Sequence, residues 1–194
     1  MSDSGEARRV LQKAAAYHRE AKDMSLRFRA EVYNAASDKH ESYQGKLLLG
    51  DSDRFRLEIP AGIYVSDGSE YWEYHPQNHQ ALLRNARNLE EGASPGGIFL
   101  RFLDADPVSM ERVKLEGREY WKLRLNPSVA LKNLDSLSVW LNPSDCSVFR
   151  IDSRDLSGNE TDYTLRSVKR NTGLKDEEFR YAPPKGAEVV DMRE

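Results

Sequence analysis

The sequence predicts an all-β or α+β fold built mainly from antiparallel strands, with one face of the sheet buried. Many short segments alternate apolar and polar residues with a period of two, and turn-forming residues separate them. Helical patterns are few and short, and the strand–helix–strand rhythm of a parallel sheet is missing from the sequence. A closed barrel, a two-sheet sandwich and an open curved sheet plugged by helices would each bury the apolar face.

The first expected element is a helix over about residues 6–23. Ser4 is a suitable N-cap, and apolar residues recur at helical spacing from Val10 to Ala21. The apolar stripe is thin because residues 14–16 are all alanine, which is too small to anchor a large core. We therefore expect this helix to lie over another layer rather than to form the centre of the fold.

Strands are expected from Ser25 onward, where Leu26, Phe28, Ala30 and Val32 alternate with polar neighbours. Clusters of Gly, Pro, Asn, Asp and Ser separate the segments that follow, which predicts hairpins and an antiparallel meander. The later strands are expected at residues 43–49, 54–59, 63–65, 71–74, 80–84, 111–116, 119–125, 136–141, 148–154, 161–168 and 178–181.

The alternation stops between residues 88 and 106, where an apolar run interrupts the strands. Ile98, Phe99, Phe102 and Leu103 recur at helical spacing after a proline suited to a first helical turn. The run predicts a short apolar helix, which favours the open sheet plugged by helices. An ordinary core helix and a mobile lid are both compatible with this pattern.

Charge and composition exclude several classes of partner. The chain has 29 Lys and Arg against 32 Asp and Glu, with both signs interspersed, so nucleic acid is not expected as a partner. No segment approaches the roughly 20 apolar residues that span a bilayer. The first six residues lack the basic and apolar regions of a signal peptide. The sequence therefore corresponds either to a cytosolic protein or to a mature chain whose signal was replaced by an initiator Met.

Residues that carry catalysis or bind metals form no recognisable motif in the sequence. His75 and His79 are separated by Pro76, which prevents the helix that would align them as metal ligands. The SPGG run at residues 94–97 lacks the lysine of a phosphate-binding loop, and there is no nucleophile-elbow pattern. Cys146 is the one cysteine and cannot form an internal disulfide. We therefore expect a protein without catalytic activity, metal or cofactor.

Three groups of motifs follow one another along the chain. YQGKL at residues 43–47 precedes DRFRL at residues 53–57, and VSDG at residues 65–68 precedes YWEYHP at residues 71–76. FRYAPPKGAEVV at residues 179–190 closes the series. In this order the motifs resemble the periplasmic outer-membrane lipoprotein carrier family, LolA, which has a G-x-L strand, an F-x-W or F-x-L strand, a V-S-D-G stretch and a closing F-x-F-x-P-P-x-G-V-x-V.

The resemblance implies a mainly β, α+β fold in which a curved antiparallel sheet forms an unclosed half-barrel, with short helices over its concave face. It implies one LolA-like domain over residues 1–194, with a helical lid insert near residues 94–104. The implied function is that of a periplasmic chaperone that binds lipoprotein acyl chains. It would shuttle acylated lipoproteins from an inner-membrane ABC exporter to an outer-membrane acceptor.

We expect a monomer whose signal peptide has been removed. The alternative is a lipid-binding or envelope-stress-sensing module of the same fold. Because such regulators usually add a second domain, the end of this chain soon after the closing motif favours the carrier.

The cavity of such a carrier is expected to be lined by apolar residues of the sheet and of the insert. On the strands, residues in step on alternating positions are predicted to face inward. The expected lipid-binding residues are Leu47, Leu49, Phe55, Leu57, Ile59, Trp72, Tyr74, Ile98, Phe99, Phe102 and Leu103.

One turn departs from the family pattern. Many members carry Lys-Arg-Pro before the F-x-W strand, and that arginine helps to hold the lid shut; Asp51 stands at the aligned position here. An ionised aspartate cannot donate the same hydrogen bonds. We expect a looser lid unless Arg54 or Arg56 reaches the same carbonyls, and we expect Asp51→Arg to restore the latch and slow the entry of an apolar probe.

Overall fold

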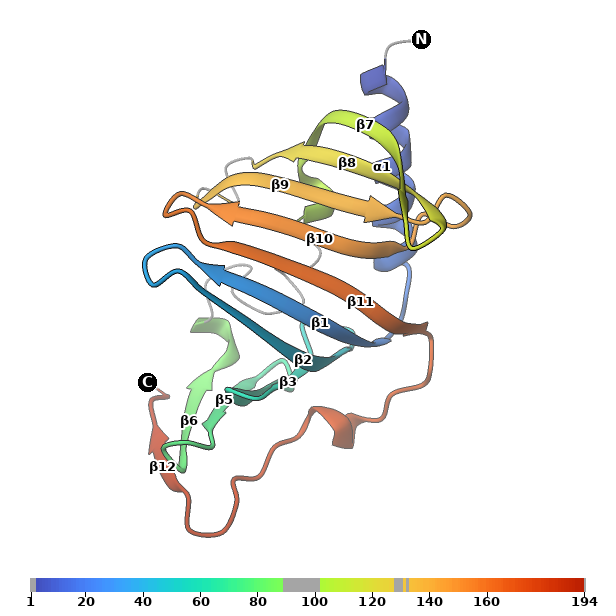
Figure 1. The fold of residues 1–194 in the computed structure, drawn as a ribbon. Coiled ribbons are helices and arrows are strands. Elements are labelled where there is room, and N and C mark those ends of the chain that lie inside the picture. Colours follow the sequence, from blue (N-terminus) through green and yellow to red (C-terminus); the bar gives the residue numbers. More distant parts are fainter. Residues whose placement is uncertain (1–2, 89–101, 128–130, 132, 194) are drawn as a thin grey trace. The chain divides into compact units, whose positions relative to one another are not determined.

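The computed structural model describes residues 3–88, 102–127, 131 and 133–193 (Figure 1). Strands dominate the described residues, and the α-helix lies near the N-terminus. The helices are α1 (Asp3–Arg19) and the 3-10 helices η1 (Ala86–Asn88), η2 (Phe102–Asp104) and η4 (Asp176–Phe179). The strands are β1 (Met24–Asn34), β2 (Lys39–Leu49), β3 (Phe55–Ile59), β4 (Gly62–Ser66), β5 (Glu70–His75), β6 (Gln80–Asn85), β7 (Asp106–Leu115), β8 (Arg118–Asn126), β9 (Leu134–Leu141), β10 (Val148–Asp155), β11 (Glu160–Arg170) and β12 (Glu188–Asp191).

The strands pair in the order β12-β6-β5-β4-β3-β2-β1-β11-β10-β9-β8-β7. β12 and β7 stand at the two ends of this order, so the sheet is not closed. β12 pairs with β6 in parallel, whereas the other pairs of known register are antiparallel. The predicted mainly β, α+β fold with an unclosed sheet is therefore confirmed. The parallel pair is a correction, and it arises because a long segment rather than a hairpin leads into β12.

The described residues belong to two compact units. The first unit comprises the described parts of Met1–Glu20, Arg29–Tyr43 and Phe99–Arg166. The second unit comprises the described parts of Ala21–Phe28, Gln44–Ile98 and Ser167–Glu194. The single domain expected over residues 1–194 stays a prediction.

The core of the first unit consists of strand residues that share one face, together with the inner side of α1. Buried apolar side chains on β8, β9 and β10 are Leu123, Leu125, Leu137, Val139, Leu141 and Ile151. α1 buries Leu11 and small alanines, and it packs against β7 and η2. The expectation that this helix lies over another layer is confirmed. It ends at Arg19 rather than near residue 23, and residues 20–23 form the turn that leads into β1 at Met24.

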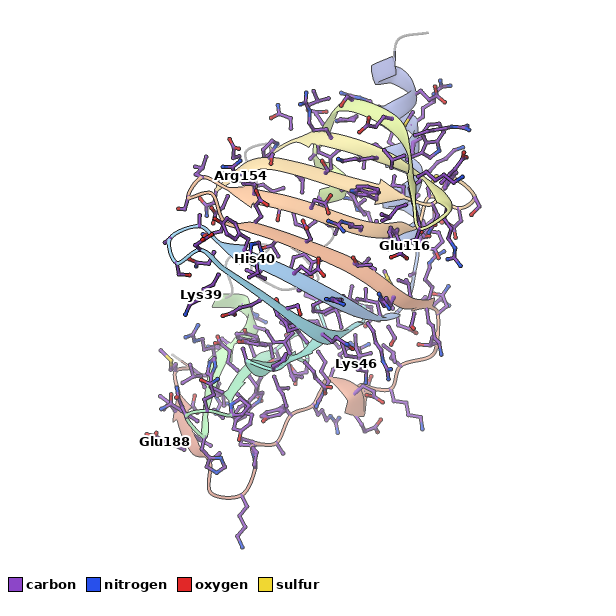
Figure 2. The ribbon with its side chains drawn as sticks, in the orientation of Figure 1. Lys39, His40, Lys46, Glu116, Arg154 and Glu188 are labelled. Atoms are coloured by element: carbon purple, nitrogen blue, oxygen red, sulfur yellow. The ribbon has the colours of Figure 1, made fainter. Side chains whose placement is uncertain are left out.

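The hairpin between β7 and β8 shows how local sequence sets these strands. Leu115 pairs with Arg118, so Glu116 and Gly117 form a two-residue loop. Both loop residues have positive φ, of 50° and 79°, as a type I′ turn requires. Figure 2 shows Glu116 at this turn and Lys39 and His40 at the start of β2, near the tip of the β1–β2 hairpin.

In the second unit, residues 171–187 form a segment, here named the C-terminal strap, that leads from β11 to β12 and contains η4. Its start is held by Asp23, whose carboxylate accepts hydrogen bonds from the backbone N–H groups of Thr172 and Gly173. Desolvation raises the pKa of Asp23, but the hydrogen bond that the Thr172 hydroxyl donates to it, together with the backbone bonds, outweighs desolvation and lowers the pKa overall. The strand predicted at residues 178–181 is wrong, because η4 occupies the first half of that range.

Candidate functional site

The register of strands β2, β3 and β4 decides which apolar side chains lie together in the second unit. Leu57 pairs with Leu47 on β2 and with Tyr64 on β4, and Phe55 pairs with Leu49. Residues paired across strands have side chains on the same side of a sheet, and so do residues two apart on one strand. Leu47, Leu49, Phe55, Leu57 and Ile59 therefore share one side, here named the Leu57 face.

Trp72 and Tyr74 lie on the opposite side of the sheet, so the prediction that they share a face with Leu57 is wrong. Trp72 pairs with Val65, which pairs with Arg56, a neighbour of Leu57 along β3. Across each of the two turns, β3–β4 and β4–β5, odd-numbered residues of one strand pair with even-numbered residues of the next. The Leu57 face therefore continues on β5 through Tyr71 and Glu73. Sequence reasoning missed these two residues, although the lengths of the two turns carried the information.

On β2 and β3 the Leu57 face is apolar but incompletely covered. Leu47 and Phe55 are buried, whereas Leu49, Leu57 and Ile59 are half-buried. Phe28 lies on the same face, because a side chain at Gly45 would meet its ring and the Ile59 methyl group. Half-buried aliphatic side chains in a row are the surface that an acyl chain would cover.

The opposite face is covered by the C-terminal strap. The ring of Tyr181 lies 6.0 Å from that of Trp72 and 6.1 Å from that of Tyr74, measured between ring centres. Arg56 donates a hydrogen bond to the backbone carbonyl of Arg180 at 3.4 Å. The chain itself thus occupies the side that carries Trp72 and Tyr74, which leaves the Leu57 face as the candidate site.

Asp51 is tied to the strap through Arg54. The Arg54 guanidinium forms an ion pair with Asp51 and a second with Asp176 at 2.6 Å, and it lies over the ring of Phe179. These bonds raise the pKa of Arg54, so its charge is secure. Asp51 thus accepts hydrogen bonds at the position where many members of the family that the sequence resembles carry an arginine, which donates them. The expected effect of Asp51→Arg on a lid stays a prediction.

The insert residues are only partly described. Ile98 and Phe99 lie outside the described residues. Phe102 and Leu103 are buried in the first unit, where η2 packs against α1. Within the described range they form one 3-10 turn, and their role as part of a lid stays a prediction.

Residues 19–182 match the family model described as "Outer membrane lipoprotein carrier protein LolA". The chain belongs to the LolA family. A curated relative described as an outer-membrane lipoprotein carrier protein, from Aeromonas salmonicida, is 26% identical over 176 residues. That alignment covers 87% of this chain and 82% of the relative.

Solved structures share the fold of this LolA-family chain. An uncharacterized conserved protein from Thermus thermophilus superposes with a TM-score of 0.61 at 18% identity and covers 96% of this chain and 99% of its own. Mycobacterium tuberculosis lipoprotein LppX superposes with a TM-score of 0.55 at 11% identity and covers 90% of this chain and 99% of its own. At these identities the likeness extends to the fold alone.

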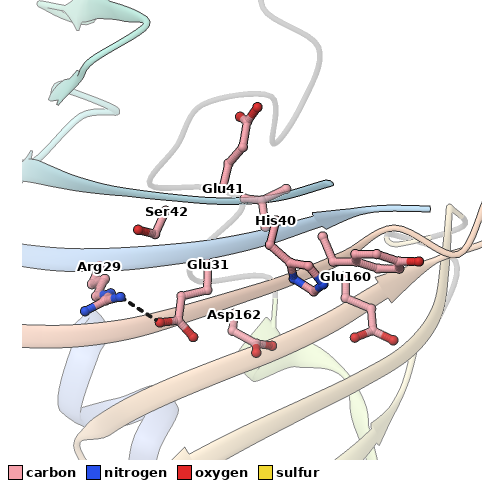
Figure 3. Close-up of a pocket in the computed structure, with 9 residues that line it drawn as sticks. Arg29, Glu31, His40, Glu41, Ser42, Glu160 and Asp162 are labelled. Atoms are coloured by element: carbon pink, nitrogen blue, oxygen red, sulfur yellow. Dashed lines mark ion pairs between the residues drawn. The ribbon is translucent and has the colours of Figure 1, made fainter. Parts of the chain in front are cut away.

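A pocket of about 440 Å³ lies in the first unit of this LolA-family chain, on a polar surface (Figure 3). Its lining residues are Arg29, Glu31, Val32, Tyr33, His40, Glu41, Ser42, Glu160 and Asp162. The rings of Tyr33 and His40 stack with centres 4.6 Å apart, and Arg29 pairs with Glu31 at 3.0 Å. Four carboxylates line this pocket, so it has the wrong chemistry for acyl chains.

Asp162 is the unusual carboxylate of this pocket. It pairs with Arg150 at 2.7 Å, but Arg150 also pairs with Asp152. Desolvation and the charge of Asp152 raise the pKa of Asp162 to about 6, against the lowering effect of Arg150; Glu160 and Glu31 add to the rise. Asp162 therefore holds its proton to a higher pH than an ordinary aspartate does.

Replacing Asp162 by asparagine is expected to flatten the pH dependence of stability between about pH 4 and pH 6. The pKa of Asp162 is higher in the folded than in the unfolded protein. Its contribution to the free energy of unfolding is therefore fully present below the unfolded pKa and is lost as pH rises through about 6. After allowance for solvent screening, we expect about 1 kcal/mol in the free energy of unfolding. Urea unfolding measured at several pH values would test this. Glu160→Gln serves as the neighbouring control, and equal slopes for wild type and Asp162→Asn would contradict the assignment.

Neither a metal-binding cluster nor a membrane-spanning helix is found in the described part of the chain. Among its His, Cys, Asp and Glu residues, no three or more are placed to hold a metal ion. No helix within it is long and apolar enough to cross a membrane.

Proposed function

We propose that this chain carries acylated lipoproteins by binding their acyl chains on the Leu57 face, and that it catalyses no reaction. The observation that carries the proposal is a row of half-buried aliphatic side chains on the side of the sheet that the strap leaves free. Family membership and the description of the Aeromonas salmonicida relative support lipoprotein as the cargo.

The energetics of acyl burial suit a carrier. Each buried methylene contributes about 0.8 kcal/mol, so two or three acyl chains bind firmly to an apolar surface. Release then requires a competing apolar site. We propose that the carrier works as a monomer in the periplasm, receives cargo from an inner-membrane ABC exporter and delivers it to an outer-membrane acceptor.

A second candidate is a lipid-binding or envelope-stress-sensing module that retains its ligand. The shared fold with a mycobacterial lipoprotein keeps this candidate open, because the fold alone does not select transfer over retention. A transfer assay separates the two. A carrier loaded with a fluorescent lipopeptide should give it up to acceptor vesicles, whereas a sensor should keep it.

Replacing Leu57 by glutamate is expected to weaken the binding of a fluorescent acylated peptide at least tenfold. A carboxylate on this face would have to be desolvated against the acyl chain. Fluorescence titration measures the affinity, and mass spectrometry should recover the acyl peptide with its mass unchanged. Leu156→Glu is the matched control, because Leu156 is exposed in a turn.

Two outcomes would contradict the carrier proposal. The first is a wild-type protein that binds no acylated peptide. The second is a Leu57→Glu protein that keeps wild-type affinity while remaining folded, as checked by circular dichroism. Hydrolysis of the acyl peptide by wild type would overturn the non-catalytic part of the proposal.

A further inference from the structure

A polar group interrupts the Leu57 face where it crosses β5 and β6. Tyr64 pairs with Glu73, and Glu73 pairs with Leu82. In the adjacent row, Tyr71 pairs with Arg84. The register thus places a carboxylate, a phenol and a guanidinium on the same side of the sheet as the aliphatic residues of β2 and β3.

These polar residues contact one another. Glu73, whose side chain is 16% exposed, forms an ion pair with Arg84 Nη1 at 3.2 Å and lies 3.6 Å from His75 Nε2. Burial and the nearby charge of Glu73 raise the pKa of Tyr71, so the hydroxyl beside Glu73 keeps its proton. The negative charge of Glu73 is balanced by Arg84 within the group.

One donor of the group is left without a partner. Arg84 Nε is buried and makes no hydrogen bond within the described part of the chain. Buried N–H groups in native proteins are nearly always paired with protein or water, and the Arg84 side chain as a whole is 40% exposed, so this donor is available to an acceptor on a ligand. A neutral acceptor fits better than an anion, because Glu73 lies beside Arg84 and repels negative charge.

We propose that Arg84 Nε donates a hydrogen bond to an acyl carbonyl oxygen of the cargo, at the point where an acyl chain joins its ester or amide. The inference rests on the proposed carrier function and deepens it. Neighbouring strands lie about 4.8 Å apart, so an acyl chain across β3, β4 and β5 brings its carbonyl to β6. The Leu57 face holds the chain, and Arg84 recognises its polar end.

The experiment compares ligands that are matched except at the carbonyl, at about pH 9.5, where the secondary amine of an N-alkyl peptide (pKa about 8) is uncharged. One pair is a diacylglyceryl-cysteine peptide and its dialkyl ether analogue; the other is an N-acyl peptide and its N-alkyl analogue. Wild type should bind the carbonyl member of at least one pair about tenfold more tightly, as expected for a hydrogen bond from a charged donor. The pair that shows the preference identifies the ester or the amide as the bonded group.

Arg84→Met should abolish that preference while leaving the affinity for the ether or alkyl member unchanged. Because this substitution leaves Glu73 without its cation, Glu73→Gln with Arg84→Met is the second variant. Arg112→Met is the matched control: Arg112 also stands on a strand, over the ring of Trp121. The infrared stretch of a ¹³C-labelled carbonyl should shift to lower frequency on binding to wild type and not on binding to Arg84→Met.

The outcomes separate this inference from the proposed function. If wild type binds neither member of either pair, the carrier proposal fails. If wild type binds all four ligands without preference, or if Arg84→Met keeps the preference, the carrier proposal survives and the role of Arg84 is refuted. An equal loss of affinity for carbonyl and non-carbonyl ligands would show a merely structural role for Arg84 and would also refute it.

Discussion

Replacing Phe179 by alanine is expected to lower the free energy of unfolding by about 3–5 kcal/mol, the range for truncating a buried aromatic ring. The Phe179 side chain is 1% exposed. Gly50 leaves room for the ring, since a Cβ there would come within 2.9 Å of Phe179 Cζ, and the Arg54 guanidinium lies 5.1 Å from the ring centre. The ring therefore fixes the strap to the turn that carries Asp51.

Urea unfolding and limited proteolysis would measure the effect of Phe179→Ala. Lys175 and Arg180 are exposed in the strap, so trypsin should cut the variant there faster than it cuts wild type. Phe149→Ala is the aromatic control, because Phe149 is half-buried and stacks on Tyr120 in the first unit. We expect that control to lose about 1–2 kcal/mol without faster cleavage in the strap. Equal losses in both variants, with an uncut strap, would contradict the anchoring role of Phe179.

Most strands were predictable because alternation and turn residues act locally. Leu26 and Phe28 are buried while Arg27 and Arg29 are exposed, as the alternation on β1 predicts. The same alternation at Phe179 and Tyr181 led to the wrong prediction of a strand over residues 178–181. Both side chains face the sheet across irregular backbone, so they alternate as strand residues do. Only tertiary packing distinguishes the two cases.

The membership of the candidate face was harder to predict than the strands. Leu47, Leu57 and Ile59 share it as expected, but Trp72 lies on the other side, because the register across two turns decides the face. A one-residue difference in register exchanges every side chain between the faces. Hydrophobicity therefore selected residues of the right type, and the turn geometry decided which side they occupy.

The polar group at Glu73 and Arg84 was missed for a different reason. Charged residues on strands are usually solvated, and the register of two strands decides which of their residues become neighbours. Their ion pair depends on the β5–β6 hairpin, which sets Tyr71 opposite Arg84 and Glu73 opposite Leu82. A charged pair on the same face as Leu57 is visible only after the strands are paired.

Replacing Gly45 by valine is expected to lower the free energy of unfolding by about 2–3 kcal/mol through overpacking. A Cβ at Gly45 would lie 2.6 Å from Phe28 Cε1 and 2.9 Å from Ile59 Cγ2. Contacts this short force the ring and the methyl group to move. For a chain of this size the melting temperature should fall by roughly 4–12 °C, which scanning calorimetry or thermal circular dichroism would measure.

A second substitution tests whether Phe28 causes the loss. Phe28→Ala alone should destabilise, because the ring is buried, but it also removes the nearest obstacle to a side chain at position 45. Gly45→Val in the Phe28→Ala background should therefore cost less than about 1 kcal/mol, so the two changes are coupled by about 2 kcal/mol. Additive losses would refute the steric account. Because Ile59 belongs to the Leu57 face, the valine at position 45 in the double variant also occupies part of the surface proposed for acyl chains. It should fold and yet bind a fluorescent acylated peptide less tightly than Phe28→Ala alone.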